Sequence, residues 1–172
     1  NKKFFLRIGT KVFKCQIGKS GYKIYTKKQE GDQATPIGKW RLKSIYYRSD
    51  KVLRPKIKNK TFKINKITKN CGWCDDPKSG CYNKYINLNK NYYIKNFNFE
   101  KLWRDDQAYD LVIETSYNTS PIIKGKGSAI FVHCSFSDGR ETAGCVSVMK
   151  KDLILLTKNI SKKVYLEIKN NF

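Results

Sequence analysis

The sequence predicts a mainly β fold, a sandwich or barrel with one helix in its C-terminal half. Three observations carry this prediction: at least seven short segments alternate apolar and polar residues, turn-forming residues separate most of them, and one segment has helical spacing. The 172 residues suffice for one domain, which at this length buries about 70% of its unfolded surface. We therefore expect a single domain over residues 1–172, with an irregular insertion at about 49–101.

Period-two alternation and two short apolar runs, Ala129–Val132 and Val146–Met149, predict the strands on either side of this insertion. Gly9-Thr10 joins the first two strands as a hairpin. Lys27–Gly38 is a loop in which Pro36 fixes its own φ and keeps Thr35 extended. The predicted strands are Phe4–Ile8, Lys11–Ile17, Tyr22–Thr26, Lys39–Arg48, Tyr109–Ser116, Ala129–Val132, Val146–Met149 and Lys163–Ile168.

The insertion at about 49–101 is the least regular part of the sequence and is rich in lysine and asparagine. Long irregular segments of this kind are usually functional, so we expect this one to lie over the sheet as a cover. Its strand-like pieces are Thr61–Ile67 and Tyr85–Leu88. A helical turn at Leu102–Ala108 and a turn region at Asn118–Gly127 are predicted after it.

One segment, Lys150–Ile160, has the spacing of a helix. Leu153, Leu156 and Ile160 recur at helical intervals, which places them on one face. Asp152 lies in the first turn, where the helix dipole favours an acid. This is the single predicted helix.

His133, the only histidine, follows the apolar run Ala129–Val132, and Cys145 precedes the apolar run Val146–Met149. Two strands joined by a loop can bring their ends together, so the imidazole and the thiol can face each other. An imidazole is suited to take a thiol proton near neutral pH, and Gly144 lets backbone amides approach an oxyanion. The pattern predicts a cysteine nucleophile with a histidine base. The alternative is a buried structural cysteine and a structural histidine.

The chain is strongly basic: 36 Lys and Arg against 14 Asp and Glu give a formal net charge of +22. Such a charge attracts nucleic acid, anionic lipid or acidic wall polymers, although scattered lysines also arise from coding bias alone. Nothing resembles a nucleic-acid-binding motif, so no specific nucleic-acid partner is expected. No apolar run reaches the roughly 18–20 residues of a membrane span. The first residue is Asn rather than Met, which suggests that a preceding segment was removed.

Six cysteines leave the redox state of the chain open. Cys71, Cys74 and Cys81 suggest a zinc site, but a fourth ligand is lacking because His133 has a better assignment, so no metal is expected. A Cys71–Cys81 disulfide is the alternative if the protein works outside the cytoplasm. Free thiols are the default.

The central residues resemble the motif of the L,D-transpeptidase catalytic domain (YkuD) family, in which a histidine and a variable loop precede Ser/Thr-His-Gly-Cys. Here His133 precedes Thr142-Ala143-Gly144-Cys145, with Ala143 in place of the second histidine. Further landmarks occur in the family's order and resemble its Thr-Pro-x-Gly-x-aromatic element and two blocks of a proteobacterial branch. These landmarks are Lys27–Leu42, Gly72–Pro77 and Leu102–Asp106.

The resemblance implies acyl transfer on peptidoglycan stem peptides in the bacterial cell envelope, outside the cytoplasm, with no metal or organic cofactor. It implies that Cys145 is the nucleophile, His133 the general base and acid, and Gly144 a backbone donor to the oxyanion. Cys134 stands where most members have Ser or Gly, and its carbonyl can still orient His133. Arg140 either clamps a substrate carboxylate or lies in solvent, and it is assigned to substrate binding with Thr142 and Ala143.

Several functions stay open at this point. The acyl group can pass to the amine of a neighbouring stem, which gives a crosslink, or to water, which gives a carboxypeptidase. It can also pass to another acceptor, such as a protein lysine or a free D-amino acid. In each case a carbapenem is expected to acylate Cys145. From a different class, a non-enzymatic protein would use its charge to bind wall polymer or nucleic acid.

Overall fold

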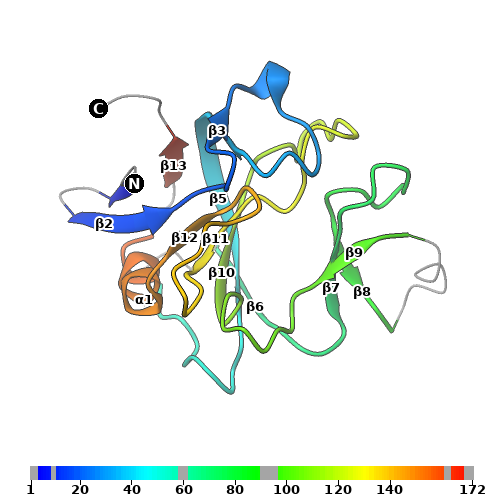
Figure 1. Ribbon diagram of the computed structural model, residues 1–172. Helices are drawn as coiled ribbons and strands as arrows, with labels where there is room; N and C mark the ends of the chain where they lie inside the picture. Colours follow the sequence, from blue (N-terminus) through cyan, green and yellow to red (C-terminus); the bar gives the residue numbers. More distant parts are fainter. Residues whose placement is uncertain (1–3, 9–10, 58–61, 90–96, 161–163, 169–172) are drawn as a thin grey trace.

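The computed structural model describes residues 1–172 except 1–3, 9–10, 58–61, 90–96, 161–163 and 169–172. The mainly β prediction is confirmed: a curled eight-stranded sheet dominates the fold, and one α-helix packs against it within the described residues (Figure 1). A separate three-stranded sheet packs on the side of the main sheet away from that helix.

The main sheet has the strand order β1-β2-β12-β11-β10-β5-β13, with β6 beside β5. The β11–β12 and β5–β6 pairs are parallel and the other neighbours are antiparallel. Its strands are β1 (Phe4–Ile8), β2 (Lys11–Gln16), β5 (Gly38–Tyr47), β6 (Lys63–Lys66), β10 (Leu111–Thr115), β11 (Phe131–Cys134), β12 (Val146–Val148) and β13 (Tyr165–Ile168). The smaller sheets pair β3 (Tyr22–Lys23) with β4 (Thr35–Pro36), and place β7 (Cys71–Cys74) between β8 (Tyr85–Asn87) and β9 (Phe99–Lys101).

Two local predictions are wrong. The strand predicted at Tyr22–Thr26 stops after two residues, because Tyr25–Lys27 turns into a 3-10 helix closed by backbone hydrogen bonds. Leu102–Ala108 forms bends rather than a helical turn. There the Asp106 carboxylate accepts from the Ala108 N–H, as polar side chains do in turns. Gly9-Thr10, Thr61 and Lys163, at the ends of predicted elements, lie outside the described residues.

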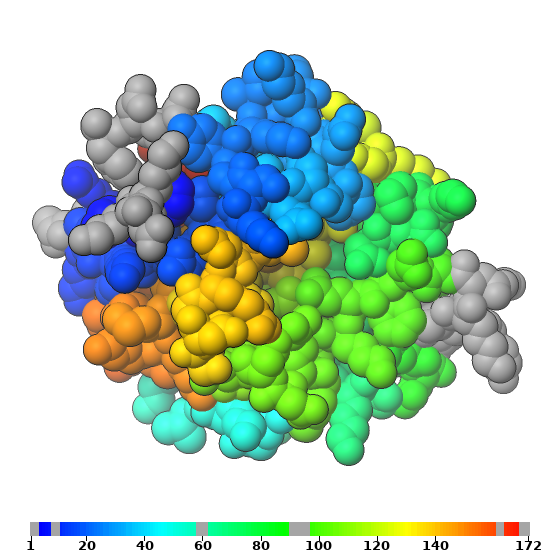
Figure 2. Space-filling model, viewed as in Figure 1, coloured from blue at the N-terminus to red at the C-terminus, as the bar shows by residue number. Residues whose placement is uncertain are grey.

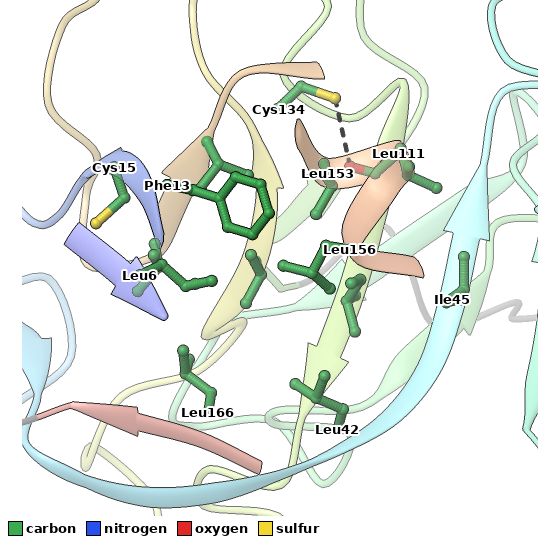
Figure 3. Close-up of a cluster of buried hydrophobic side chains, with 14 of the residues drawn as sticks. Leu6, Phe13, Cys15, Leu42, Ile45, Leu111, Cys134, Leu153, Leu156 and Leu166 are labelled. Carbon is green, nitrogen blue, oxygen red and sulfur yellow. Dashed lines mark hydrogen bonds between the residues drawn. The ribbon is translucent and has the colours of Figure 1, made fainter. Parts of the chain in front are cut away.

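The first hydrophobic core fills the space between the sheet and α1 (Lys150–Lys158). Leu153 and Leu156 project from the helix towards apolar side chains of the sheet (Figure 3). The apolar spacing of the helix is what buries this face, since Leu153 is fully buried while the first-turn Asp152 is only half-buried. The strand side chains labelled in this core are Leu6, Phe13, Cys15, Leu42, Ile45, Leu111, Cys134 and Leu166.

A second core lies on the opposite face of the same strands. Here Val112 and Phe131 of the main sheet pack against Trp73 of β7 and Tyr109. All residues of β10, β11 and β12 are therefore buried, because alternate side chains enter one core or the other. The second core is the face that carries the candidate site.

Candidate active site

Strands β11 and β12 carry the candidate residues. They run parallel, with His133 paired to Ser147, and Cys145 precedes β12 opposite Phe131. Paired residues project to the same face, so Phe131, His133, Cys145 and Ser147 share the face covered by the second core. The structure brings the imidazole and the thiol to one face of adjacent parallel strands, offset along the strands, rather than to strand ends that face each other.

The segment Thr142–Cys145 is held by a hydroxyl. Thr142 Oγ1 donates to the Cys145 carbonyl oxygen at 2.6 Å and accepts from the Gly144 N–H at 3.1 Å. The Gly144 N–H, one of the oxyanion donors expected from the sequence, is therefore engaged by a side chain. Among the described residues, the Cys145 N–H has no hydrogen-bond partner.

The loop that contains Thr35-Pro36 lies directly against this segment. The Thr35 hydroxyl approaches the Cys145 carbonyl oxygen at 3.4 Å and accepts from the Gly18 N–H at 2.8 Å. A Cβ at Gly144 would lie 3.0 Å from the Ala34 carbonyl oxygen, and the Gly144 φ of +138° disfavours any side chain. Two motifs far apart in the sequence thus meet at one backbone position, and only glycine fits between them.

The Cys145 sulfur faces the start of β11. Its thiol donates to the Ala129 carbonyl oxygen at 3.0 Å and its Sγ accepts from the Phe131 N–H at 3.3 Å. Within the described part of the chain it has no hydrogen bond to His133. Burial raises the pKa of Cys145 to about 12, and the Glu100 carboxylate adds to this shift. Cys145 is therefore a neutral thiol at neutral pH.

The His133 imidazole is buried and oriented by backbone. Its Nδ1 lies 2.8 Å from the Cys134 carbonyl oxygen, which can only accept, so Nδ1 carries the proton and Nε2 is the basic nitrogen. The rings of Tyr109 and Phe136 pack edge-on to it, with centroids at 5.4 and 5.8 Å. Burial lowers the pKa of His133 to about 4, an effect that the Cys134 carbonyl partly offsets. The imidazole is neutral at neutral pH, as a general base must be.

A charged wall borders the site on the side of β9. Tyr109 donates its hydroxyl hydrogen to Glu100 at 2.7 Å, and Arg104 lies 3.4 Å from the same carboxylate. Arg104 also forms a two-point contact with Asp106 at 2.9 and 2.5 Å, which lowers the pKa of that carboxyl. Burial raises the pKa of Glu100, so a carboxyl with a weakened tendency to ionise stands near the sulfur.

The residues assigned to substrate binding from the sequence lie in different environments. Arg140 is exposed, stacks 4.0 Å over the Phe136 ring and pairs with Asp138 at 3.0 Å. Thr142 is buried and its hydroxyl serves the backbone, whereas Ala143 is exposed. In Figure 2 the loop with Arg140 (orange), the Lys27–Gly38 loop (blue) and the segment after β9 (green) meet on one surface of the molecule.

A model of the L,D-transpeptidase catalytic domain family matches residues 2–166. The chain belongs to this family. Neither a curated protein nor a solved structure matches the chain. The match covers nearly the whole chain, and the L,D-transpeptidase family is one of acyl-transferring enzymes related to the bacterial cell wall. The β11–β12 face with Cys145 and His133 is therefore the candidate active site of an L,D-transpeptidase domain.

The cysteines of this L,D-transpeptidase domain are all described and all are free thiols, so the Cys71–Cys81 disulfide is not formed. Cys71 instead accepts from the Tyr85 hydroxyl at 3.2 Å. In the part of the chain that the structure describes, no group of three or more His, Cys, Asp or Glu side chains could hold a metal ion. No described helix is long and apolar enough to cross a membrane.

Sequence reasoning missed Glu100, Tyr109 and Ser147. Ser147 is predictable from the sequence, because alternation from Cys145 along a strand places residue 147 on the same face. Glu100 and Tyr109 carry no such signal, since their place beside the site depends on how the small sheet packs.

The buried Ser147 hydroxyl gives a stability prediction for this L,D-transpeptidase domain. Ser147 is 0% exposed, and its Oγ has no hydrogen-bond partner among the described residues. Such a group costs about 1–3 kcal/mol, so Ser147→Ala is expected to raise the free energy of unfolding by about 1 kcal/mol in urea denaturation. Thr115→Val is the contrast, because the Thr115 hydroxyl donates to the Ile130 carbonyl oxygen at 2.6 Å and its loss is destabilising. A destabilised Ser147→Ala protein would contradict the prediction.

Proposed function

We propose that the protein is a cysteine-dependent L,D-transpeptidase that acts on peptidoglycan stem peptides in the bacterial cell envelope, outside the cytoplasm. The observation that carries the proposal is the shared face of β11 and β12. On it lie the buried imidazole of His133 and the thiol of Cys145, the last residue of the Thr142–Cys145 segment. Family membership supplies the reaction class.

The first half of the reaction forms a thioester. The Cys145 sulfur attacks the carbonyl carbon between the third stem residue, a diamino acid, and the fourth, D-Ala, while His133 Nε2 takes the thiol proton. The tetrahedral intermediate collapses as His133 returns that proton to the D-Ala nitrogen, and D-Ala leaves as an amine. Because the thiol and the imidazole are both neutral at rest, proton transfer accompanies attack rather than preceding it.

The second half regenerates the thiol. An acceptor amine attacks the thioester carbonyl, His133 takes one proton from the amine, and the proton passes to the departing Cys145 sulfur as the new amide bond forms. The free Cys145 N–H is the better oxyanion donor in both halves, since the Gly144 N–H is engaged by Thr142. The Cys134 carbonyl holds Nδ1, so Nε2 stays available.

The acceptor defines three variants of this proposal. An amine of a second stem gives a crosslink, water gives an L,D-carboxypeptidase, and a free D-amino acid or a protein lysine gives a non-stem product. A separate candidate is a non-enzymatic protein that binds wall polymer or nucleic acid, and the net charge of +22 is the observation that favours it.

The test is product analysis on purified disaccharide tetrapeptides by mass spectrometry. We expect a dimer whose mass equals two substrates less one D-Ala. A tripeptide product assigns the carboxypeptidase, and exchange of D-Ala for added D-Met assigns a non-stem acceptor. Unchanged substrate, with protein of native thermal stability, would contradict all three variants and leave the binding protein.

A further inference from the structure

A groove of about 850 Å³ lies away from the nucleophile, along β5 and β6. Strand β5 has β13 on the edge of its first half and β6 on the same edge of its second half, so the groove opens where these two neighbours meet. Tyr85 of β8 closes the side towards the small sheet, and its ring stacks on Tyr46 with centroids 6.0 Å apart.

The charge of this groove is positive and largely unpaired. Glu114 is its only described acid; its side chain is 7% exposed, and Lys43 neutralises it at 2.8 Å. Three further cations line the groove from two strands and are exposed to solvent, and none has an ion pair among the described residues. They are Arg41, Lys63 and Lys66.

These features favour a carboxylate-bearing polymer as the occupant. An unpaired guanidinium offers two parallel donors to a carboxylate, and lysines add point charges that a polyanion neutralises with release of counterions. Tyr85 is 41% exposed and offers an apolar ring face to a sugar. Because the groove is lined by residues of two paired strands, β5 and β6, a chain fits it better than a compact ligand.

The groove and the candidate nucleophile can serve the same polymer. From β5 the order runs through β10 and β11 to β12, which is three strand spacings, or about 15 Å at about 4.8 Å each. An extended stem of four residues spans at most about 14 Å. Contacts at the groove therefore lie about one stem length from Cys145, with the small sheet between them.

We propose that this groove is a second binding site, which holds an anionic peptidoglycan strand through its stem carboxylates while another stem of that strand reaches Cys145. This inference rests on the proposed function for the identity of the polymer. The site serves polymeric substrate and contributes nothing to the turnover of a single soluble stem.

The test uses two charge-matched triple variants of the whole protein. The groove variant is Arg41→Gln/Lys63→Gln/Lys66→Gln. The control variant is Lys11→Gln/Lys14→Gln/Lys151→Gln, which removes three exposed cations from β2 and α1. Both variants lose three positive charges, so a difference in their binding to sacculi depends on where the charges were removed. We measure co-sedimentation with purified sacculi at several salt concentrations, and turnover of sacculi and of soluble disaccharide tetrapeptide.

We expect the groove variant to bind sacculi about tenfold more weakly and with a shallower salt dependence, and the control to stay within about twofold of wild type. Turnover of sacculi should fall with binding, while turnover of the soluble tetrapeptide stays unchanged in both variants. Equal losses in the two variants would overturn the proposal in favour of general charge. If wild-type protein binds sacculi with amidated carboxylates as well as it binds untreated sacculi, the carboxylate assignment is overturned. If the groove variant loses binding to a DNA duplex but keeps binding to sacculi, the groove is assigned to nucleic acid instead.

This outcome is separable from failure of the proposed function. If wild-type protein leaves the soluble tetrapeptide intact, the enzymatic proposal fails. The comparison of the two variants on sacculi still decides whether the groove binds the polymer.

Discussion

Replacing Cys145 by alanine is expected to abolish D-Ala release from tetrapeptide, by at least about 10³-fold, while leaving the protein folded. The sulfur is the only nucleophile that the protein itself supplies in the proposed reaction, so no residual pathway through a thioester remains. The fold should persist, because the side chain gives up two hydrogen bonds, to Ala129 and Phe131, worth about 1 kcal/mol each, and a partly buried sulfur at the margin of the second core. D-Ala release and a thermal unfolding curve measure the two effects.

The matched control is Cys81→Ala, which removes a half-buried thiol outside the site. It should retain wild-type turnover. Intact-mass spectrometry gives an independent reading, since a carbapenem should add one adduct to wild type and to Cys81→Ala, and none to Cys145→Ala. D-Ala release by the Cys145→Ala protein, or an adduct that survives this substitution, would refute the assignment.

The second large effect is the loss of the base. His133→Gln is expected to lower kcat/KM by about 10²–10⁴-fold, the usual contribution of a positioned base. In wild type, burial lowers the pKa of His133 to about 4, so kcat/KM should stay level from neutral pH down to about pH 5 and fall only as pH approaches about 4. An acid limb near pH 6.5 would show that the imidazole is not the buried group described.

The same group couples stability to pH. Because its folded pKa lies below the unfolded value, the unfolded chain binds more protons between about pH 6.5 and 4. Its stabilising contribution is complete above about pH 6.5 and is lost as pH falls through this window, by about 3 kcal/mol. Urea denaturation at pH 7 and 4.5 measures the change in the free energy of unfolding. His133→Gln should remove the part of this change that comes from the imidazole. Identical pH dependence in wild type and variant would contradict the prediction.

Alkylation of the thiol distinguishes the resting state proposed here from an ion pair. Burial raises the pKa of Cys145 to about 12, so the rate of iodoacetamide labelling should climb steadily with pH through the alkaline range. A labelling rate that is already maximal near pH 6 would reveal a preformed thiolate and imidazolium.

Much of the fold follows from local pattern. Alternation sets the bounds of β1, β2 and β5 to within one residue, and the spacing of Leu153 and Leu156 sets the helix. Strand β7 is missed because Cys71 and Cys74 can be interpreted as ligands or disulfide partners, whereas in the structure they are buried beside Trp73. The sequence alone cannot separate these roles, since cysteine behaves both as a ligand and as a small apolar residue.

The site is predicted less completely than the fold. The sequence identifies His133 and Cys145 as the chemical pair, but the parallel pairing of β11 with β12 depends on contacts distant in sequence. That pairing places Cys145 opposite Phe131, and the thiol donates a hydrogen bond to the Ala129 carbonyl oxygen. The engagement of the Gly144 N–H by Thr142 is likewise a local side-chain choice that no spacing rule predicts.

Because β11 and β12 are buried on both faces, the register of β12 against β11 decides whether the Cys145 thiol lies on the reactive face. Odd-numbered positions from 131 to 147 in these strands meet the second core, and even-numbered ones meet the helix. Sliding β12 by a single residue would exchange Cys145 for Val146 on the reactive face and push the thiol among leucines. Lengthening the connection at 135–141 should therefore preserve activity only when β12 keeps its register against β11. The rate of Cys145 labelling would report whether that register is kept.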